Sequence, residues 1–503
     1  MIRDGRPAPE SPALATTAHR PGPVVGPTVA FHSFGCKLNQ CETAGIRSRF
    51  VEAGFAAVSV LDTGSAPTTS GLVVADVHVV NTCSVTGRAD AQARQLVRKL
   101  IRQQPGSRVV VTGCYAQRAP EEIARIPGVF LVAGNGEKDR LHELVGGMLG
   151  EAGGSGSSEP RAIPGSPGIL AVRIAVSDLR KAHRSFDLDP IDFGEKTRAF
   201  LRVQDGCDAG CTFCIIPRIR GRSSSMDIDQ AVAQARAVIA AGYREIVLTG
   251  IHLGMYGRDP VRGPEPAPGF RGPSLARLID AIHEIPGSYR LRLSSIEPQE
   301  IDDELIDRMV DGRLVPHLHV PLQSGADRIL ARMNRTYRAD EYDAVLRRLA
   351  SRVDPMGIGA DVIVGFPGET DADFEETYLF IEDRPFTYLH VFPFSPRPGT
   401  RAATLPGRPQ GPVVDERSAR LRALSDQKKV AFARRLVGRT VEVLVEEPGD
   451  HDYWDGWSEP YVRVRFPFSA GDDLTGEMVR IEVDESLPDG TLAGRVVWRP
   501  PPD

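Results

Sequence analysis

Three cysteines lie close together in one short loop, Cys207-Asp-Ala-Gly-Cys211-Thr-Phe-Cys214, directly after a strand-like run that begins at Ala199. Thiolates at this spacing can hold one corner of an iron–sulfur cube, and they offer three ligands to its four irons. The iron without a protein ligand can bind a small molecule, which makes the cluster chemically competent as well as redox-active. This set, the core triplet, therefore predicts a redox centre at the end of a strand.

A structural zinc site is the alternative for this loop. Zinc in such sites takes four protein ligands, and the loop supplies only three. His183 precedes the loop by 24 residues and His252 follows it by 38, so neither is a local fourth ligand. The spacing favours the cluster over zinc.

Length and composition set the frame for this loop. A chain of 503 residues exceeds what one hydrophobic core usually serves, which predicts two or three domains. No apolar run approaches 18 residues, so we expect no membrane span. Residues 1–27 are rich in Pro and Ala and lack the apolar core of a signal peptide, so we expect a disordered extension there. Seven cysteines without an export signal then indicate a reducing cytoplasm and metal or thiol chemistry.

The segment 28–149 alternates short apolar strands with helical patterns. Strands are expected at 29–34, 75–80 and 108–112, and helices at 39–52, 89–102 and 137–148. Such alternation indicates a doubly wound parallel sheet.

A stretch rich in Gly, Ser and Pro begins at residue 150, and we take 150–192 as a linker. Six strand candidates follow in the segment 193–436, at 200–203, 245–249, 289–293, 317–320, 360–364 and 388–392. Helical patterns lie between them, for example at 229–241, 274–284 and 340–351. Six βα units are too few for a closed eight-stranded barrel. We therefore expect a partial (βα)6 barrel with its chemistry at the carboxyl ends of the strands.

A helix expected at 416–436 leads to short alternating strands in 437–500, which predict a small all-β barrel. Aromatic and cationic side chains in this segment suit stacked bases and phosphates, although a solvated face over core aromatics explains them nearly as well. They are Tyr453, Trp454, Trp457, Arg463 and Arg465, with Arg434, Arg435 and Arg439 just before the barrel. Arg463 and Arg465 alternate with valines, so we expect both on one exposed face.

A second set of cysteines, the strand-end triplet, is Cys36, Cys83 and Cys114. Each follows an expected strand. Because neighbouring strands are about 4.8 Å apart, three adjacent strand ends fall within roughly 10 Å, which one cube can bridge. Gly35 and Gly113 would permit tight turns around it. Three unrelated buried thiols are the alternative. Cys41, in the helix after Cys36, is expected to be a packed side chain.

Both cysteine sets and several strings resemble the radical S-adenosylmethionine (SAM) methylthiotransferases. The strings are Gly35-Cys-Lys-Leu-Asn-Gln, Asn81-Thr-Cys-Ser-Val-Thr, Gly113-Cys-Tyr-Ala-Gln, Leu248-Thr-Gly-Ile-His-Leu-Gly, His319-Val-Pro-Leu-Gln-Ser-Gly and Phe392-Pro-Phe-Ser-Pro-Arg-Pro-Gly-Thr. The resemblance covers roughly 29–498 and is closest to the MtaB-type branch, which acts on N6-threonylcarbamoyladenosine next to the tRNA anticodon. It implies an auxiliary-cluster domain at 28–149, a radical-SAM core at 193–436 and a TRAM RNA-binding domain at 437–500. Cys41 departs from the family pattern, where we expect an aromatic residue.

The resemblance also implies the chemistry. A 4Fe–4S cluster on the core triplet would cleave SAM to a 5′-deoxyadenosyl radical, which can attack the unactivated C–H bond at carbon 2 of adenine. A second 4Fe–4S cluster on the strand-end triplet would hold a sulfide that a second SAM methylates. The expected partners are the tRNA anticodon arm, an electron donor such as flavodoxin or ferredoxin, and a sulfur source.

Six residues are expected around SAM. Phe213 would lie near the adenine of SAM, and the backbone at Thr249 and Gly250 would meet its methionyl group. The remaining candidates, at or near later strand ends, are Ser295, Gln323 and Asp361. Ordinary core packing or hydrogen bonding at the barrel rim is the alternative for each.

Three other functions remain open. Two belong to the same family: methylthiolation of N6-isopentenyladenosine in tRNA, and methylthiolation of an aspartate in a ribosomal protein. The third is a non-enzymatic RNA-binding protein with structural zinc. Iron and zinc content separates the last from the others, because two cubes hold about eight irons per chain.

Overall fold

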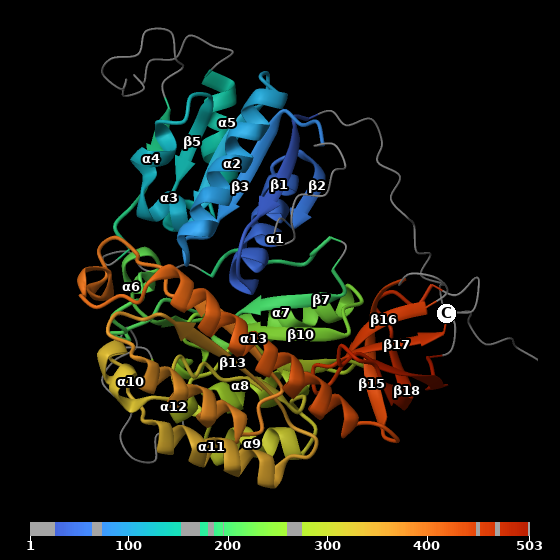
Figure 1. Cartoon of the computed structure of the whole chain (residues 1–503). Helices are drawn as coiled ribbons and strands as arrows, with labels where there is room; N and C mark the ends of the chain where they lie inside the picture. The colour runs from blue at the N-terminus through green and yellow to red at the C-terminus, as the bar shows by residue number, and fades with distance from the viewer. Residues whose placement is uncertain are drawn as a thin grey trace, which may run out of the picture.

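A computed structural model describes residues 26–62, 73–151, 172–179, 186–194, 196–258, 274–448, 453–467 and 473–500. Three units follow one another along the chain (Figure 1). Most of the predicted extension, most of the predicted linker and His183 lie outside the described residues. Among the described helices, none has both the length and the apolar character needed to cross a bilayer.

The N-terminal unit is a six-stranded parallel sheet in the order β2-β1-β3-β4-β5-β6. Its strands are β1 (Thr28–Ser33), β2 (Ala56–Asp62), β3 (Val77–Thr82), β4 (Arg108–Gly113), β5 (Val129–Ala133) and β6 (Arg173–Ala175). Its helices are α1 (Lys37–Glu52), α2 (Gly87–Gln103), α3 (Cys114–Arg118), α4 (Pro120–Ala124) and α5 (Leu141–Glu151). Helices α1 and α5 pack on one face and α2, α3 and α4 on the other, as expected for a doubly wound sheet.

Three details of this unit differ from the expectation. The strands β2 and β5 were not predicted, and the helix expected from residue 137 begins only at Leu141. Strand β6 lies within the predicted linker range and pairs in parallel with β5. Three residues at a sheet edge are too short to give a periodic signal in sequence.

The central unit contains the six predicted strands. They are β7 (Arg198–Arg202), β10 (Glu245–Thr249), β11 (Arg290–Leu293), β12 (His317–His319), β13 (Gly357–Val364) and β14 (Tyr388–Pro393). They form two three-stranded parallel sheets, β11-β10-β7 and β12-β13-β14, joined by a bridge between Ser295 and His319. No pairing of β7 with β14 occurs among the described residues, so the barrel is open, as predicted.

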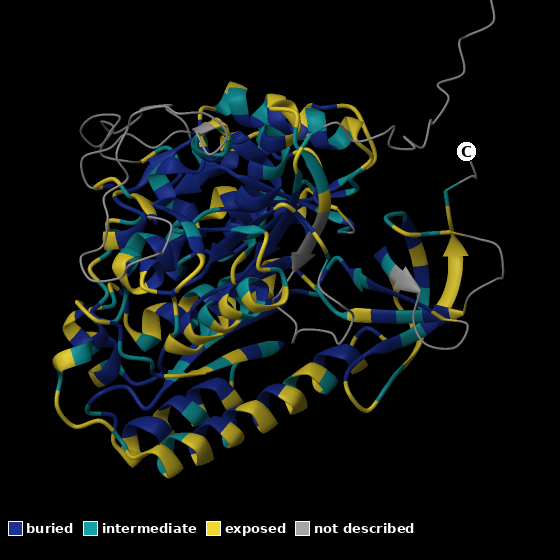
Figure 2. Ribbon diagram, turned by 90° about the horizontal axis from the view of Figure 1, so that it is seen from above, coloured by how far each residue is buried: buried dark blue, intermediate teal, exposed yellow. Residues whose placement is uncertain are grey.

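Helices cover the outside of this partial barrel. They are α7 (Ile228–Ala240), α8 (Leu275–His283), α9 (Asp303–Val310), α10 (Asp327–Met333), α11 (Ala339–Arg352) and α12 (Asp371–Glu382). Figure 2 shows the strands as mostly buried ribbon, with exposed residues mainly on the outer helices. A short hairpin of β8 (Gln204–Asp205) and β9 (Ser224–Ser225) flanks the loop that carries the core triplet, which ends in α6 (Ile216–Ile219).

The C-terminal unit is a closed five-stranded barrel in the order β15-β16-β17-β19-β18. Helix α13 (Gly411–Arg434) packs against β14 of the core and then leads into the first strand of the barrel (Figure 1). The barrel strands are β15 (Thr440–Pro448), β16 (Tyr453–Ser458), β17 (Arg463–Pro467), β18 (Met478–Ser486) and β19 (Leu492–Trp498). Strand β16 was not predicted, because Trp454-Asp-Gly shows no clean alternation. Trp454 is 2% exposed and belongs to the barrel core, so it is not a surface platform for bases.

A buried carboxylate attaches this barrel to the core. Glu245 is fully buried and binds Arg290 at 2.6 Å and Arg292 at 2.9 Å. The same two arginines donate to barrel carbonyls, Arg290 to Trp457 at 2.8 Å and Arg292 to Glu459 at 3.0 Å. Burial raises the pKa of Glu245, but the two arginines outweigh it and hold that pKa well below its usual range. Core strands β10 and β11 thereby fix the position of the barrel.

Glu245→Gln should loosen this attachment, because it leaves two buried guanidinium groups without their counter-charge. We expect the free energy of unfolding of the barrel to fall by about 3–5 kcal/mol. The chain's three tryptophans, Trp454, Trp457 and Trp498, all lie in the barrel, so tryptophan fluorescence in a urea titration reports on this unit.

The matched control is Glu375→Gln, which removes a half-exposed surface ion pair with Arg420. That change should stay within about 0.5 kcal/mol. Equal effects of the two substitutions would contradict the role given to Glu245.

Candidate active site

The strand-end triplet lies where the sequence places it. Cys36 precedes α1, Cys83 follows β3 and Cys114 opens α3, directly after β4. Strands β1, β3 and β4 are consecutive in the sheet, so the three thiols lie at one edge. Burial, together with the neighbouring Cys36 and Cys114 thiols, raises the pKa of Cys83 to about 12.

Glycine makes this convergence possible. Gly35 has φ +90°, and a side chain there would meet Cys83 Sγ at 2.7 Å. Gly113 has φ +96°, and a Cβ atom there would meet Thr82 O at 2.4 Å. Both positions need the left-handed backbone and the missing side chain that only glycine provides. Cys41, by contrast, is 2% exposed in the hydrophobic core, as predicted for a packed side chain.

The core triplet lies in the loop between β8 and α6, and backbone hydrogen bonds hold that loop. Cys207 N donates to Gly221 O at 3.1 Å, and Thr212 N donates to Met333 O at 2.9 Å. All three thiols are partly accessible. Burial raises the pKa of Cys214 to about 12. In the absence of a metal ion this thiol therefore stays protonated at neutral pH.

Two cationic side chains that sequence reasoning missed lie against the core triplet. His252 Nδ1 is 3.4 Å from Cys207 Sγ, and its Nε2 is 2.5 Å from Glu300 Oε1. Burial lowers the pKa of His252, but these two partners outweigh it and raise that pKa to about 10. Arg335 donates to Cys211 Sγ at 3.3 Å. Both cations stabilise thiolate charge, so the loop is prepared to bind a metal centre.

His252 was set aside as a local fourth ligand because of its distance in sequence, yet its imidazole lies against the loop. Counting 38 residues from Cys214 hides the fact that β10 runs parallel to β7 and ends beside the same loop. The sequence did contain a signal for His252. It comes three residues after the end of a strand, and the carboxyl ends of the strands are where a parallel barrel has its active site. Arg335 carries no comparable signal, because it lies in the turn after α10.

A buried ion network joins the two cysteine loops. Glu42, on the helix after Cys36, binds Arg220 through both oxygens at 2.6 and 3.0 Å. Arg220 also binds Asp205 at 3.2 Å, immediately before the core-triplet loop. Lys138 and Arg202 complete the shell around Glu42. Burial raises the pKa of Glu42, but Arg220, Lys138 and Arg202 together hold it well below its usual range.

A hollow of about 210 Å³, the cluster hollow, opens between the two loops. Its wall includes Val85 and Thr86, just after Cys83, and Cys214 from the core triplet. Further lining comes from Phe213, Ile215, Ile216, Gln323, Asp361, Ile363, Phe392, Pro393, Phe394, Ser395 and Arg397. Arg397 crosses to the N-terminal unit, where it pairs with Asp90. Both units therefore build one chamber.

The six residues expected around SAM separate into two groups. Phe213, Gln323 and Asp361 line the cluster hollow. Gln323 has φ +64° and exchanges backbone hydrogen bonds with β13. Thr249 is buried at the end of β10, and Gly250 packs on Gln204, where a Cβ atom would meet Oε1 at 2.8 Å. Thr249, Gly250 and Ser295 are not among the residues that line this hollow.

Neither cysteine triplet has the spacing of a single-ion site. Only one group of three His, Cys, Asp or Glu side chains in the described ranges has ligand atoms within 4.8 Å of one another, and it contains no cysteine. A tetrahedral zinc ion needs thiolate sulfurs about 3.8 Å apart. Three cysteines gathered in one loop or at one sheet edge, without that close spacing, suit the larger geometry of a polynuclear iron–sulfur cluster.

A second hollow, the barrel hollow, has a volume of about 340 Å³ and lies where the core meets the β-barrel. Trp457 and Tyr461 stack in its wall with ring centroids 4.5 Å apart. Arg463 also lines it. Arg463 and Arg465 lie on one face of β17, opposite the fully buried Val464, as predicted. Both pair with the buried Asp455, at 2.9 and 3.1 Å.

Two family models match the chain. One, described as the radical SAM superfamily, matches residues 201–381, and one described as an uncharacterized protein family, UPF0004, matches residues 28–134. Threonylcarbamoyladenosine tRNA methylthiotransferase MtaB of Bacillus subtilis is 38% identical over 91% of this chain and 93% of that protein. The MtaB of Thermotoga maritima is 32% identical over 93% of this chain and 97% of that protein.

A relative that is named for a different substrate has a similar sequence identity and coverage. The tRNA-2-methylthio-N(6)-dimethylallyladenosine synthase of Erythrobacter litoralis is 33% identical over 93% of this chain and 97% of that protein. Among solved structures, the radical SAM methyltransferase TsrM of Kitasatospora setae superposes with a TM-score of 0.52 at 15% identity. It covers 75% of this chain and 77% of that one. This likeness concerns the fold alone.

Replacing all three cysteines of the core triplet with Ala should leave about half of the iron of the anaerobically reconstituted protein, because the strand-end triplet keeps its own site. SAM cleavage should be abolished. Iron analysis by mass spectrometry and cleavage assays check both results. Cys41→Ser is the matched control and should keep the full iron content. Full iron in the triple variant would exclude the loop as a cluster site.

Proposed function

Because the chain belongs to the radical-SAM tRNA methylthiotransferase family, we propose that it methylthiolates carbon 2 of N6-threonylcarbamoyladenosine beside the tRNA anticodon. The observation that carries this proposal is the cluster hollow, whose wall combines residues after Cys83 with Cys214. A substrate held there meets radical generation and sulfur delivery in one chamber. Five relatives at 32–38% identity carry the threonylcarbamoyladenosine name, which supports this substrate.

We assign the core triplet to the SAM-cleaving cluster and the strand-end triplet to a second 4Fe–4S cluster. When bound, the first cluster would pass an electron to SAM, and the second would hold the sulfide that is to be methylated. The protein's own side chains prepare these sites. His252 and Arg335 lower the cost of thiolate charge on the core triplet, and Arg220 does the same near Cys36 and Cys114. An external electron donor and a sulfur source complete the proposed cycle.

Phe213, Gln323 and Asp361 are the site residues that the cluster hollow supports. The Phe213 and Phe366 rings pack in a T-shaped arrangement with centroids 6.4 Å apart, which holds the Phe213 ring in the wall of the hollow. Ile363 and Phe392 give the wall of the hollow an apolar surface. The proposal also keeps Thr249, Gly250 and Ser295 near SAM, because they lie at or just after strand ends. Thr249 and Gly250 would act through their backbone.

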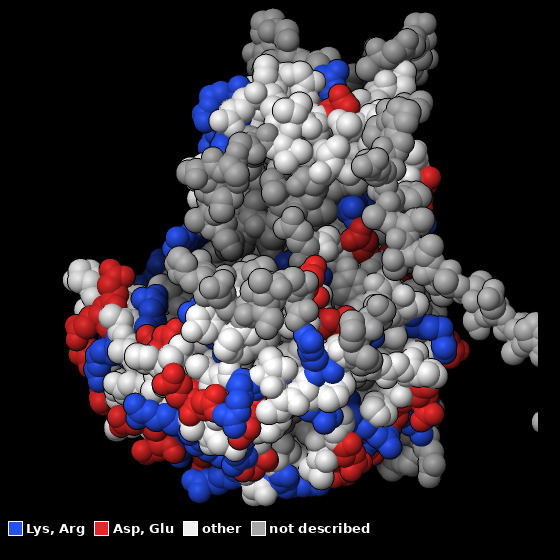
Figure 3. All heavy atoms as spheres, turned by 90° about the vertical axis from the view of Figure 1, so that its right-hand side faces the viewer, with Lys and Arg blue, Asp and Glu red and all other residues white. Residues whose placement is uncertain are grey.

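The barrel hollow is the proposed entry for the anticodon arm. The stacked Trp457 and Tyr461 offer an aromatic platform for a neighbouring base, and Arg463 offers a cation for its phosphate. Figure 3 shows acidic and basic side chains interspersed on the face that it draws, without one broad basic patch. On this face, RNA contact would therefore depend on local sites.

An assay with three anticodon stem-loops tests the substrate directly. The stem-loops carry adenosine, N6-threonylcarbamoyladenosine or N6-dimethylallyladenosine at the same position, and the nucleosides are analysed by mass spectrometry after turnover. We expect the 2-methylthio product mainly from the threonylcarbamoyl stem-loop. Product mainly from the dimethylallyl stem-loop would transfer the assignment to that substrate.

Cys83→Ala should separate the two halves of the chemistry. SAM cleavage needs the core triplet and should stay measurable, whereas the methylthio product should disappear because sulfur delivery has lost a ligand. Both are measured by chromatography of the same reaction. Wild-type product levels from a protein in which the whole strand-end triplet is replaced by Ala would contradict the assignment.

Replacing Arg463 and Arg465 with Gln should weaken tRNA binding. Each arginine that neutralises a phosphate releases a counterion, so the slope of log Kd against log salt should fall by up to about two units. Fluorescence anisotropy over a salt series measures both. Arg495→Gln is the matched control, since Arg495 is an exposed barrel arginine paired with Glu482 and Asp484. Equal affinity and slope in the double variant and in the wild type would place RNA recognition elsewhere.

A further inference from the structure

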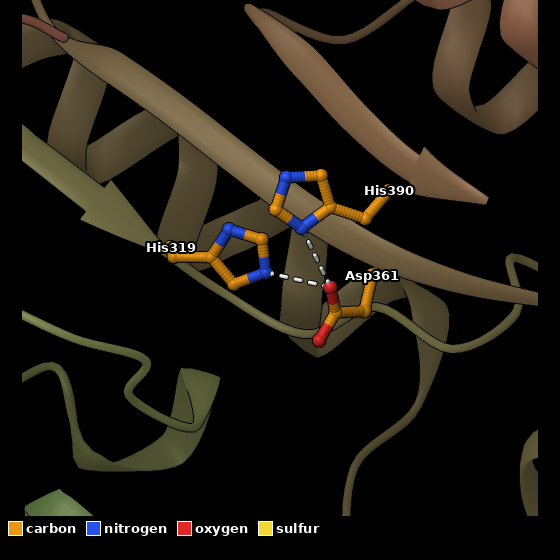
Figure 4. A group of neighbouring side chains, drawn as sticks. All are labelled: His319, Asp361 and His390. Carbon is orange, nitrogen blue, oxygen red and sulfur yellow. Dashed lines mark hydrogen bonds and ion pairs between the residues drawn. The ribbon is translucent and has the colours of Figure 1, made fainter. Parts of the chain in front are cut away.

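Three polar side chains outside the cysteine loops form one compact group, drawn in Figure 4. His319 Nε2 lies 2.9 Å from Asp361 Oδ1, and His390 Nδ1 lies 3.3 Å from the same oxygen. Each comes from a different strand of one sheet, β12, β13 and β14, and Asp361 and His390 are direct register partners. The two imidazole rings stack with centroids 5.0 Å apart. The group is therefore built by the sheet itself.

The hydrogen bonds determine which atoms of this group are free. An ionised carboxylate only accepts hydrogen bonds, so both histidines direct an N–H toward Asp361. The other nitrogen of His319 is used, because Nδ1 lies 3.3 Å from the Tyr388 hydroxyl. Within the described chain, His390 Nε2 and Asp361 Oδ2 have no hydrogen-bond partner. These two atoms can bind a ligand.

The three side chains lie between the cluster hollow and the barrel hollow. Asp361 lines the cluster hollow and His390 lines the barrel hollow. His390 and Phe392 lie two residues apart on one face of β14, and Phe392 lines the cluster hollow. The side chain of His390 is 56% exposed, compared with 11% for His319. Strand β14 therefore leads from the hollow lined by Cys214 to His390.

We propose that His390, held by Asp361 and His319, binds the carboxylate of the substituent on N6 of the substrate adenine. This inference rests on the proposed function. The threonylcarbamoyl group ends in a carboxylate and a hydroxyl, whereas the dimethylallyl group is a hydrocarbon. In its imidazolium form His390 donates from both ring nitrogens, from Nδ1 to Asp361 and from Nε2 to the substrate carboxylate. The free Oδ2 of Asp361 accepts a hydrogen bond from the substrate hydroxyl.

The same group also explains rejection of the hydrocarbon. A dimethylallyl group at this position would cover polar atoms of His390 and Asp361 without giving them a hydrogen-bond partner. Sites built to bond a polar group disfavour analogues that lack it, because the buried polar atoms stay unpaired. His390 is thus a specificity-determining residue rather than part of the radical chemistry.

The experiment measures binding of the reconstituted holoenzyme to two anticodon stem-loops that differ only in adenosine or N6-threonylcarbamoyladenosine. The wild type should prefer the threonylcarbamoyl stem-loop. His390→Ala should reduce its affinity for that stem-loop about tenfold and leave its affinity for the adenosine stem-loop within about twofold. His390→Asn keeps a donor toward Asp361 but lacks Nε2, and it should lose the preference equally. His283→Ala, an exposed histidine at the end of α8, is the matched control.

Three outcomes would overturn the inference. One is a wild type that binds both stem-loops alike, and another is a His390→Asn variant that keeps the preference. Two imidazoles and a carboxylate are also a donor set for divalent metals, so the third is a wild-type preference that disappears with a chelator. Product analysis of the wild type is run in parallel. Methylthiolation of the threonylcarbamoyl stem-loop together with any of these outcomes would overturn the inference alone, whereas its absence would overturn the proposed function.

Discussion

Glu42 and Arg220 form the buried ion pair on which the arrangement of the two cysteine loops depends. Glu42 lies on the helix that follows Cys36, and Arg220 lies just after the loop that carries Cys214. Both are almost completely buried, at 1% and 0% exposure. Removing either partner would leave a charge without water or counter-charge, which costs several kcal/mol. The fold can therefore bury these residues only when the N-terminal unit and the core meet in one orientation.

That orientation has a chemical consequence, because it places Cys214 of the core triplet and the residues just after Cys83 against one chamber. Cys114 packs with Ile215 and Ile219, next to Cys214, so the contact between the units is also a contact between the cluster loops. On the other side of the chamber, Arg397 reaches Asp90 of the N-terminal unit. The barrel is attached separately, through Glu245 and its two arginines. The proposed methylthiolation needs radical generation and sulfur delivery close together, which this arrangement of the two cysteine loops would allow.

Much of this site was readable in the sequence because it depends on local rules. Cys36, Cys83 and Cys114 were recognisable as a group since each follows a strand, and parallel strands end at one edge. The six core strands were readable for the same reason, as apolar runs between amphipathic helices. Strand β6 was not, because three residues carry no period. The Glu42–Arg220 pair was not either, since residues 178 positions apart leave no pattern in either segment.

Anomalous diffraction at the iron edge from crystals of the anaerobically reconstituted protein tests the central claim most directly. The account predicts two separate iron peaks that face the same chamber, one bounded by the strand-end triplet and one by the core triplet. A single peak, or zinc at either triplet, would contradict it.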